Sequence, residues 1–335
     1  MPARILIVGA GAIGSFYGSR LACAPHALVS ALCRSNYKAV KNKGFTITSP
    51  KFENYSFLPE HVFANPAEAR NAAVKWDYLL VATKVLPEFS DDSSLLEGLV
   101  GPQTSIVLMQ NGLGIEAPYA RRFPKASILT ATTIASVAQP KPGHIAHQIY
   151  TKISMGPYIH DHSGGRSEEA MQDCSRFIEL LKAGGIADAE MYNHEDMQYV
   201  RWGKVAINCA MNPSSVLSGG RDTKAMASDP ELSRHLLGVM EEVLHAAEKV
   251  LRRPPPAFIP KPEEVLRAQL RADRGSIPSM WVDWENGTRL ELEVILGNPL
   301  RMAREVGVDT ARVQTMYALL RKMQESRDRR SKGKL

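Results

Sequence analysis

The first half of the chain shows short apolar runs separated by longer mixed segments. Each run is four to eight residues long and is bounded by glycine or polar residues, which is typical of strands buried in a parallel sheet. The runs lie at residues 5–8, 26–33, 76–82 and 105–109. Later β-rich runs at 128–138 and 144–156 flank a turn of prolines and glycine, which predicts an antiparallel addition to the sheet. The stretch at 44–63 predicts a hairpin or an irregular crossover.

The second half is dominated by apolar residues at helical spacing. Helices are expected at residues 195–211, 231–252, 263–271, 292–305 and 311–325. Pro213 is expected to stop the first of them, and another helix is expected to run from a polar turn at 160–169 to residue 183. We therefore predict an α/β domain with a doubly wound sheet at residues 1–192 and an all-helical domain at 193–335.

The first apolar run leads into a glycine-rich turn and then a helix of small residues. In the sequence GAGAIG, Gly9 permits the tight turn, Gly11 lets a ligand approach the backbone, and Gly14 lets the helix pack closely on its strand. Ala12 and Ile13 begin the helix, whose positive end suits a pyrophosphate. A purely structural turn is the alternative, but the strand, turn and helix context favours a bound dinucleotide.

The second expected strand ends at Arg34, about 20 residues after the glycine turn, where an NAD site usually carries an acid for the ribose hydroxyls. The local sequence, Cys33-Arg34-Ser35-Asn36, contains a cation and small polar donors and no carboxylate. A guanidinium matches a 2′-phosphate in charge and in geometry, so NADP(H) is the expected cofactor. The alternative is an ordinary exposed arginine at a strand end.

Polar residues also follow the next two strands of the expected sheet. Lys84 comes just after the third apolar run, and Gln110-Asn111-Gly112 follow the fourth. Ligands of doubly wound sheets bind beyond the carboxyl ends of the strands, so Lys84 and Asn111 are candidates for cofactor or substrate contacts. Asn-Gly is also a common turn dipeptide, and both interpretations stay open.

A polar stripe marks the first helix of the second half, where Lys204, Asn208 and Asn212 recur every four residues among apolar neighbours. This spacing places them on one helix face. Lysine and asparagine are costly to bury without partners, so the stripe predicts a face turned toward a ligand in a cleft; the alternative is a solvent-exposed edge. A lysine there can protonate a carbonyl oxygen as hydride arrives, provided that burial lowers its pKa.

Composition excludes several classes of function. The formal net charge is +6, but much of the basic excess lies in the last residues, where it predicts a solvated tail rather than a nucleic-acid-binding arm. The four cysteines form no Cys-x-x-Cys pair, and His144 and His147 fall on opposite faces of a strand, so no metal site is expected. No secretion signal and no apolar stretch of roughly 20 residues is present. We expect a cytoplasmic protein without a membrane or nucleic-acid partner.

Several of these motifs occur together in the order of a known family. They are VGAGAIG at the N-terminus, Thr83-Lys84, QNG at 110–112, the K-x-x-x-N-x-x-x-N-P helix, PSM-x-x-D at 278–283 and R-x-E-x-E at 289–293. Together they resemble the ketopantoate reductase (2-dehydropantoate 2-reductase) family over nearly the full length. The resemblance implies an N-terminal Rossmann domain, a helical C-terminal domain, and NADPH-dependent reduction of 2-dehydropantoate to pantoate on the route to pantothenate and coenzyme A.

The same resemblance implies roles for individual residues. Lys204 would be the general acid, and Glu291 would bind the substrate hydroxyl or keep Lys204 protonated. The substrate would be held by Asn208, Asn212, Asn111 and, at its carboxylate, Ser279. The cofactor would be contacted by Gly9, Gly11, Ala12, Ile13, Gly14, Arg34, Lys84 and Asn111. From the residues alone, Ser279 equally suits a helix N-cap and Glu291 a surface acid, so these alternatives stay open.

Two other functions stay open as well. The proline-containing loop at 252–262 and the Trp281-Val282-Asp283-Trp284 stretch are not features of the family's shared core, and they lie close to the substrate-binding motifs, which leaves room for a different 2-oxo acid as substrate. A dinucleotide-binding domain without turnover would instead make an NADPH sensor, although the retained Lys204 set argues against one. We expect the substrate to bind in a cleft between the domains. A homodimer is a further hypothesis.

Overall fold

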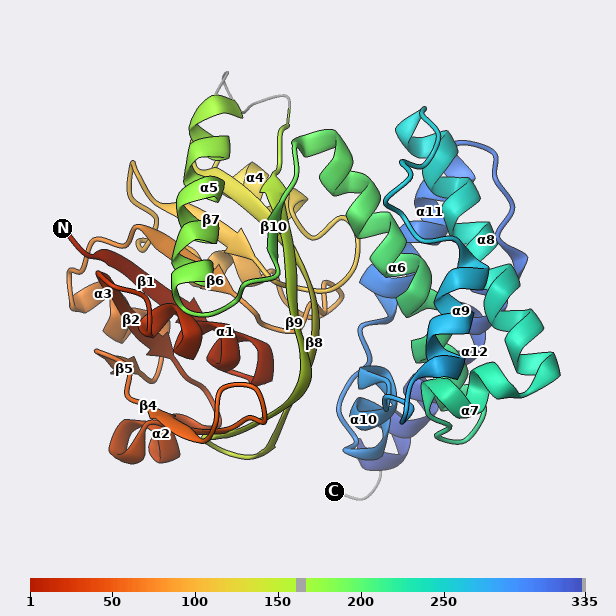
Figure 1. Cartoon of the computed structure of the whole chain (residues 1–335), viewed down its shortest axis with the longest axis horizontal. Helices are drawn as coiled ribbons and strands as arrows, with labels where there is room; N and C mark the ends of the chain where they lie inside the picture. The colour runs from red at the N-terminus through yellow and green to blue at the C-terminus, as the bar shows by residue number, and fades with distance from the viewer. Residues whose placement is uncertain (161–166, 333–335) are drawn as a thin grey trace. The chain divides into compact units, whose positions relative to one another are not determined.

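The computed structural model describes residues 1–160 and 167–332, so most of the polar turn expected at 160–169 lies outside the described residues (Figure 1). The chain forms two compact units. Unit 1 comprises Met1–Val85, Asp91–Gln110 and Ile115–Met197. Unit 2 comprises Leu86–Ser90, Asn111–Gly114 and Gln198–Leu335. Two short segments from the first half of the chain therefore belong to unit 2.

Unit 1 is built on a 10-stranded sheet with the order β4-β3-β9-β8-β7-β6-β1-β2-β5 and with β10 paired to β9. Its parallel centre consists of β1 (Ala3–Val8), β2 (Ala27–Leu32), β6 (Tyr78–Val81) and β7 (Ser105–Leu108). Most of their side chains are buried, which explains why these strands appear in the sequence as continuous apolar runs. The strand order reverses between β1 and β6, the switch point at which doubly wound sheets bind ligands. The expected fold class is confirmed.

The other strands extend the sheet on both sides. They are β3 (Phe45–Thr48), β4 (Tyr55–Phe57), β5 (Val62–Phe63), β8 (Ser127–Lys141), β9 (His144–Pro157) and β10 (Ala189–Met191). β8 and β9 pair antiparallel, which confirms the expected addition to the sheet. β3 and β4 also pair antiparallel, so the stretch at 44–63 contains a hairpin.

The helices of unit 1 pack on this sheet. They are α1 (Ala12–Ala22), α2 (Tyr37–Lys43), α3 (Pro66–Asn71), the 3₁₀ helix η1 (Asp92–Leu96), α4 (Ala117–Arg122) and α5 (Ser167–Ala183). α1 and α5 contact each other and both contact β8 and β9 (Figure 1). Phe16 and Tyr17 of α1 and Phe177 of α5 are fully buried there, so these large side chains fix α1 against the sheet.

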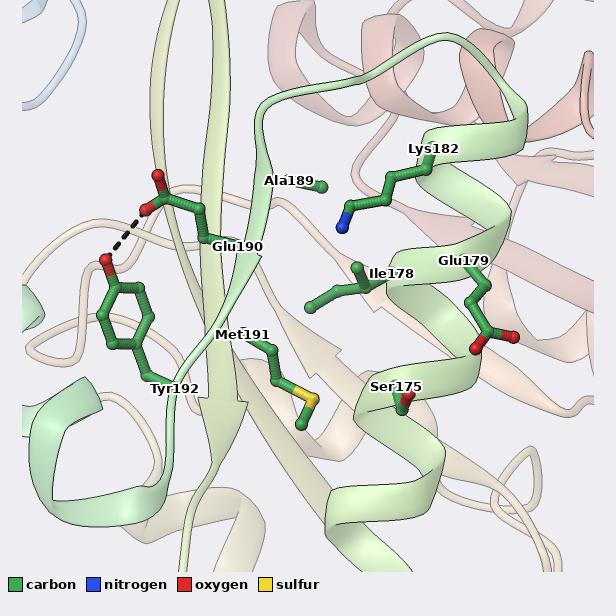
Figure 2. Close-up of a pocket in the computed structure, with 8 residues that line it drawn as sticks. All are labelled: Ser175, Ile178, Glu179, Lys182, Ala189, Glu190, Met191 and Tyr192. Atoms are coloured by element: carbon green, nitrogen blue, oxygen red, sulfur yellow. Dashed lines mark hydrogen bonds between the residues drawn. The ribbon is translucent and has the colours of Figure 1, made fainter.

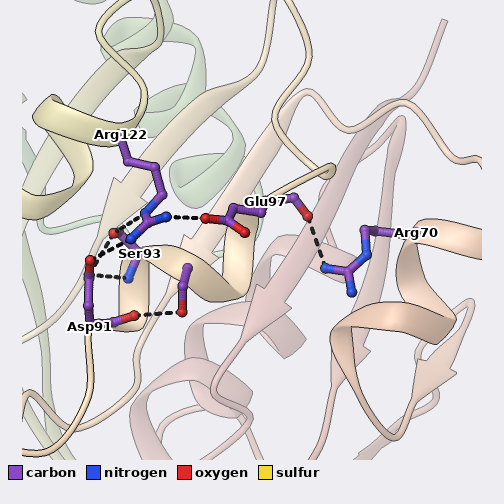
Figure 3. A network of polar contacts seen from close by, with 6 residues as sticks. Arg70, Asp91, Ser93, Glu97 and Arg122 are labelled. Carbon is purple, nitrogen blue, oxygen red and sulfur yellow. Dashed lines mark hydrogen bonds and ion pairs between the residues drawn. The ribbon is translucent and has the colours of Figure 1, made fainter.

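A polar network fixes the segment that precedes and forms η1 (Figure 3). Arg122 of α4 donates from Nε to Ser93 Oγ at 2.8 Å and from Nη2 to Asp91 Oδ2 at 2.7 Å. It also pairs with Glu97, whose backbone oxygen accepts from Arg70 Nη1 at 3.0 Å. Asp91 caps η1 by accepting the Ser93 amide. These contacts fix the place where the chain re-enters unit 1, directly after the unit 2 segment Leu86–Ser90.

Unit 2 is helical throughout its described elements. They are α6 (His194–Leu217), which begins in unit 1, α7 (Thr223–Ser228), α8 (Pro230–Leu251), α9 (Pro262–Arg271), α10 (Ser279–Glu285), the π-helical turn η2 (Glu293–Gly297), α11 (Asn298–Glu305) and α12 (Ala311–Lys332). Within the described part of the chain, no helix combines the length and apolar content of a membrane span.

Pro213 does not stop α6, so this expectation is wrong. The helix continues to Leu217 with Pro213 inside it. Proline in a helix interior removes a backbone hydrogen bond and costs about 3 kcal/mol. The residues that follow it, Ser214, Ser215 and Val216, are all buried, and their packing maintains the helix. Two further differences are the unexpected short helices α7 and α10.

Candidate functional site

The turn between β1 and α1 has the geometry that a bound dinucleotide requires. Gly9 has a φ of +99°, and a Cβ there would lie 2.6 Å from Thr83 N, so only glycine fits. A Cβ on Gly14 would lie 2.4 Å from Gly9 O, because the helix packs directly on the turn. A Cβ on Gly11 would meet no atom of residues 1–160 and 167–332 within 4 Å. Open space therefore lies beside the backbone at the position where a pyrophosphate is expected.

The amino end of α1 faces this space without a side-chain cap. Ser15 N donates to Gly11 O at 3.0 Å, so the amides of Ala12 and Ile13 precede that helical bond. Gly11 is the N-cap and has no side chain, and the first turn carries no acid. Ala12 and Ile13 are both partly exposed. These amide donors and the space at Gly11 fit a phosphate group.

The loop after β2 lies against the same turn. Asn36 is buried, and its Nδ2 donates to Ala10 O at 2.7 Å, so this carboxamide holds the loop against the glycine turn. Arg34, two residues earlier, is exposed. An exposed guanidinium at a strand end without an acid fits the 2′-phosphate of NADP(H).

The ends of β6 and β7 are joined to each other at the carboxyl edge of the sheet. Gln110 Nε2 donates to Thr83 Oγ1 at 2.9 Å, and Gln110 Oε1 accepts from the Tyr119 hydroxyl at 3.4 Å. The Gly9 turn packs on Thr83, and the exposed Lys84 directly follows it. The structure thus brings the glycine turn, Lys84 and the start of the QNG motif to one edge of unit 1.

In unit 2, α6 presents the predicted stripe on one face. Asn208 and Asn212 are 8% and 5% exposed, and Lys204 is half-buried, so the stripe is not a solvent-exposed edge. Among the described residues, none forms a hydrogen bond or ion pair with the Lys204 ammonium. A cation in this setting is available for a ligand.

Burial also changes the acidity of Lys204. Desolvation lowers the pKa of its ammonium from the ordinary value of 10.5, because removal from water penalises the charged form. A lysine with a lowered pKa gives up its proton more readily near neutral pH. Lys204 is therefore a candidate proton donor.

The loop that carries Asn111 is attached to unit 2. We call Asn111–Gly114 the Asn111 loop. Arg201 of α6 is buried and donates from Nη2 to Gly112 O at 3.1 Å. Leu113 N donates to Val294 O of η2 at 3.0 Å. Arg201 thus joins the loop to α6, the helix of the predicted general acid, and the Leu113 amide joins it to η2. Sequence reasoning missed Arg201, although an arginine on an otherwise apolar part of a helix is a usable signal.

The two remaining predicted residues differ in their surroundings. Glu291 is 8% exposed and lies just before η2, so it is not a surface acid. Ser279 is exposed and is the first residue of α10, whose N-cap is Pro278. The alternative of Ser279 as an N-cap is therefore wrong. The segment before α10 is held by Ser276 N, which donates to Thr223 Oγ1 at 3.0 Å.

Figure 2 shows a pocket on unit 1 whose lining includes none of the predicted site residues. It lies between α5 and β10 and is lined by Ser175, Ile178, Glu179, Lys182, Ala189, Glu190, Met191 and Tyr192. Glu190 pairs with Lys152 at 2.8 Å and accepts from the Tyr192 hydroxyl at 2.8 Å, so its charge is already compensated. In the described residues, no group of three or more His, Cys, Asp or Glu side chains is arranged to hold a metal ion.

Comparisons with known proteins cover both units. The family model "Ketopantoate reductase PanE/ApbA" matches residues 5–160, and the model of its C-terminal part matches residues 196–324. A 2-dehydropantoate 2-reductase of Nostoc sp. is 29% identical, over 95% of this chain and 94% of that protein. The uncharacterized protein YDL144C of Saccharomyces cerevisiae is 29% identical, over 95% of this chain and 92% of that protein. The crystal structure of a 2-dehydropantoate 2-reductase from Methylococcus capsulatus is 32% identical, with a TM-score of 0.81 and 97% of each chain covered.

Proposed function

The chain belongs to the ketopantoate reductase family, and we propose that it reduces 2-dehydropantoate to pantoate with NADPH. Membership makes it an oxidoreductase of 2-oxo acids that uses a nicotinamide cofactor. The particular acid, the preference for NADPH over NADH, and a place in cytoplasmic pantothenate and coenzyme A synthesis are parts of the proposal.

The observation that carries the proposal is the half-buried Lys204 ammonium, which pairs with none of the described residues and shares a helix face with Asn208 and Asn212. NADPH, when bound, supplies a hydride to the keto carbon. Lys204 hydrogen-bonds the keto oxygen, stabilises the negative charge that develops there and transfers the proton that completes the hydroxyl group. Asn208 and Asn212 orient the substrate, and their burial limits the rotation of their carboxamides.

The rest of the substrate is assigned to three residues of unit 2. Ser279 is exposed and donates its hydroxyl hydrogen to the substrate carboxylate. Glu291 accepts a hydrogen bond from the substrate hydroxyl, or stabilises the protonated form of Lys204. Asn111 contributes its carboxamide from a loop that is attached to the same unit as Lys204. These assignments follow the family motifs and the burial of each side chain.

The cofactor is assigned to unit 1. The open space at Gly11 and the amides of Ala12 and Ile13 accommodate the pyrophosphate. The exposed Arg34 guanidinium pairs with the 2′-phosphate, which NADH lacks. Lys84 adds a second cation at the carboxyl edge of the sheet.

A second candidate is the reduction of a different 2-oxo acid by the same groups. It is favoured by the two tryptophans of α10, which closely follow Ser279 and match no family motif. Trp281 packs so closely on Gly220 that a Cβ there would lie 2.4 Å from Trp281 Cζ2. Aromatic walls of this kind change which acyl group fits without changing the chemistry at the carbonyl.

The two candidates are separated by kcat/KM for a panel of 2-oxo acids with NADPH. We expect 2-dehydropantoate to exceed pyruvate, 2-oxoisovalerate and phenylglyoxylate by about 100-fold or more, since a site built to hydrogen-bond a substrate hydroxyl rejects analogues that lack it. A higher value for phenylglyoxylate would favour the second candidate. Binding of NADPH without oxidation by any acid of the panel would instead indicate a sensor.

A further inference from the structure

The carbonyl that receives the Leu113 amide is made available by the π-helical turn η2. In this turn the Asn298 amide donates to Glu293 O, so it does not donate to Val294 O as it would in an α-helix. The next residue, Pro299, has no amide hydrogen and supplies no donor either. Val294 O therefore lacks a donor from its own helix and accepts the Leu113 amide at 3.0 Å.

The side chain of Asn298 holds the same loop residue. Its Nδ2 donates to Leu113 O at 2.6 Å. Its Oδ1 accepts from Arg301 Nη2 at 2.6 Å, which fixes the orientation of the carboxamide. The same Arg301 nitrogen donates to Glu293 Oε2 at 2.8 Å, and the Tyr317 hydroxyl donates to the other oxygen of that carboxylate. Glu293, the second acid of the R-x-E-x-E motif, thus supports the Asn111 loop.

Close packing reinforces these bonds. Gly112 has a φ of +98°, and a Cβ there would lie 2.5 Å from Val294 Cβ, so the loop backbone sits directly on η2. Arg201 holds Gly112 O from the opposite element, α6, one helical turn before Lys204. The three hydrogen bonds that reach the loop, from Arg201, from Asn298 and to Val294 O, all involve its backbone atoms. The contacts therefore fix the path of the chain and leave the Asn111 side chain for other partners.

We propose that Arg201, Asn298 and the Val294 carbonyl are positioning groups for the reduction. They attach the Asn111 loop to the unit that carries Lys204, so that the Asn111 carboxamide and the Lys204 ammonium keep a fixed relation to each other. The inference rests on the proposed function, in which Asn111 contacts substrate or cofactor. The three groups act through Asn111 and do not themselves touch the reacting atoms.

The test is Asn298→Asp in the full-length protein. This change keeps the size of the side chain and an oxygen for Arg301, but it places a carboxylate oxygen against Leu113 O. We expect kcat to fall about 10- to 100-fold, because small displacements of a contacting group are costly in catalysis. We also expect faster amide hydrogen exchange in the peptide that covers the Asn111 loop. Arg304→Ala, on an exposed position of the same helix, serves as the matched control and should change neither value.

A double-mutant cycle with Asn111→Ala distinguishes positioning from general destabilisation. If Asn298 acts through Asn111, Asn298→Asp should lower kcat by less than about 2-fold once Asn111 is alanine. An equal loss of kcat in both backgrounds, or unchanged exchange in the loop, would overturn the inference. Amide hydrogen exchange is measured without substrate. It therefore tests whether Asn298 attaches the Asn111 loop to unit 2, even if the wild-type protein reduces no 2-oxo acid. A wild-type protein that reduces no 2-oxo acid would overturn the proposed function instead.

Discussion

Lys204 shows how far single residues can be predicted. Its common face with Asn208 and Asn212 follows from helical spacing alone, and the structure confirms this face and its burial. Arg201 and Asn298 were not predicted, because their acceptors are backbone carbonyls of a loop that is distant in sequence. Spacing within one helix is encoded locally, whereas such partners depend on the tertiary fold.

Replacing Lys204 with methionine should separate catalysis from cofactor binding. Because the ammonium donates the proton, we expect Lys204→Met to lower kcat by about 10²- to 10⁴-fold, while the Kd of NADPH changes less than about 3-fold. Steady-state kinetics and NADPH fluorescence titration measure the two quantities. Lys249→Met, at an exposed position of α8, is the control. Parallel losses in kcat and NADPH affinity would make Lys204 a structural residue.

The pH dependence of kcat/KM reports the acidity of Lys204. Only the protonated ammonium acts as the donor, so activity is constant below its pKa and falls about tenfold per pH unit above it. Since burial lowers this pKa from 10.5, the decline should begin below pH 10.5. The residual activity of Lys204→Arg should lack this decline, because a guanidinium stays protonated. A wild-type profile that stays flat up to pH 10.5 would contradict the assignment.

At the scale of elements, the glycine turn was predictable, whereas the full length of α6 and the π-helical turn η2 were not. The turn can be predicted because its glycines are required by local geometry. Gly9 adopts a positive φ, and Gly14 allows close packing of the helix. The continuation of α6 through Pro213 was not, because burial of the following residues decides it. The π-helical turn before Pro299 was not predicted either, since its free carbonyl is used by a loop outside the helix.

Gly11→Ala tests the glycine turn as a binding element. A Cβ at this position meets no atom of the described residues within 4 Å and Gly11 has a φ of −81°, so the unfolding midpoint without cofactor should stay within about 1 °C of the wild type. The Kd of NADPH should rise at least about 10-fold, because the methyl group occupies the pyrophosphate's space. Gly9→Ala is the contrasting variant and should also lower the unfolding midpoint, since its Cβ would lie 2.6 Å from Thr83 N. Unchanged NADPH affinity in Gly11→Ala would show that the pyrophosphate does not bind beside Gly11.

At the scale of the whole molecule, the sequence predicts an α/β part followed by a helical part, and both are observed. It does not predict that Leu86–Ser90 and Asn111–Gly114 belong to the helical unit. These segments follow strands and read as ordinary strand-end loops, so only their contacts with distant helices reveal where they belong. Asn111 is thereby grouped with Lys204 rather than with the glycine turn.

Cofactor preference should be visible in the stability of the whole protein. At about 100 times its Kd, NADPH should stabilise the folded state by about 2.7 kcal/mol, and NADH at the same concentration should do so by much less. Arg34→Ala should reduce the NADPH effect to that of NADH, because the exposed guanidinium is assigned to the 2′-phosphate. Thermal unfolding measures both effects. Equal stabilisation of the wild type by NADPH and NADH would show that Arg34 does not bind the 2′-phosphate.

The stoichiometry of the reaction decides whether this chain transfers a hydride from NADPH to 2-dehydropantoate. Purified protein would be incubated with 2-dehydropantoate and NADPH, with NADPH loss followed by absorbance and pantoate followed by mass spectrometry. We expect one pantoate to form for each NADPH oxidised, and we expect Lys204→Met to show both changes only at a residual rate. NADPH that remains unoxidised, or is oxidised without pantoate, would contradict the proposed hydride transfer.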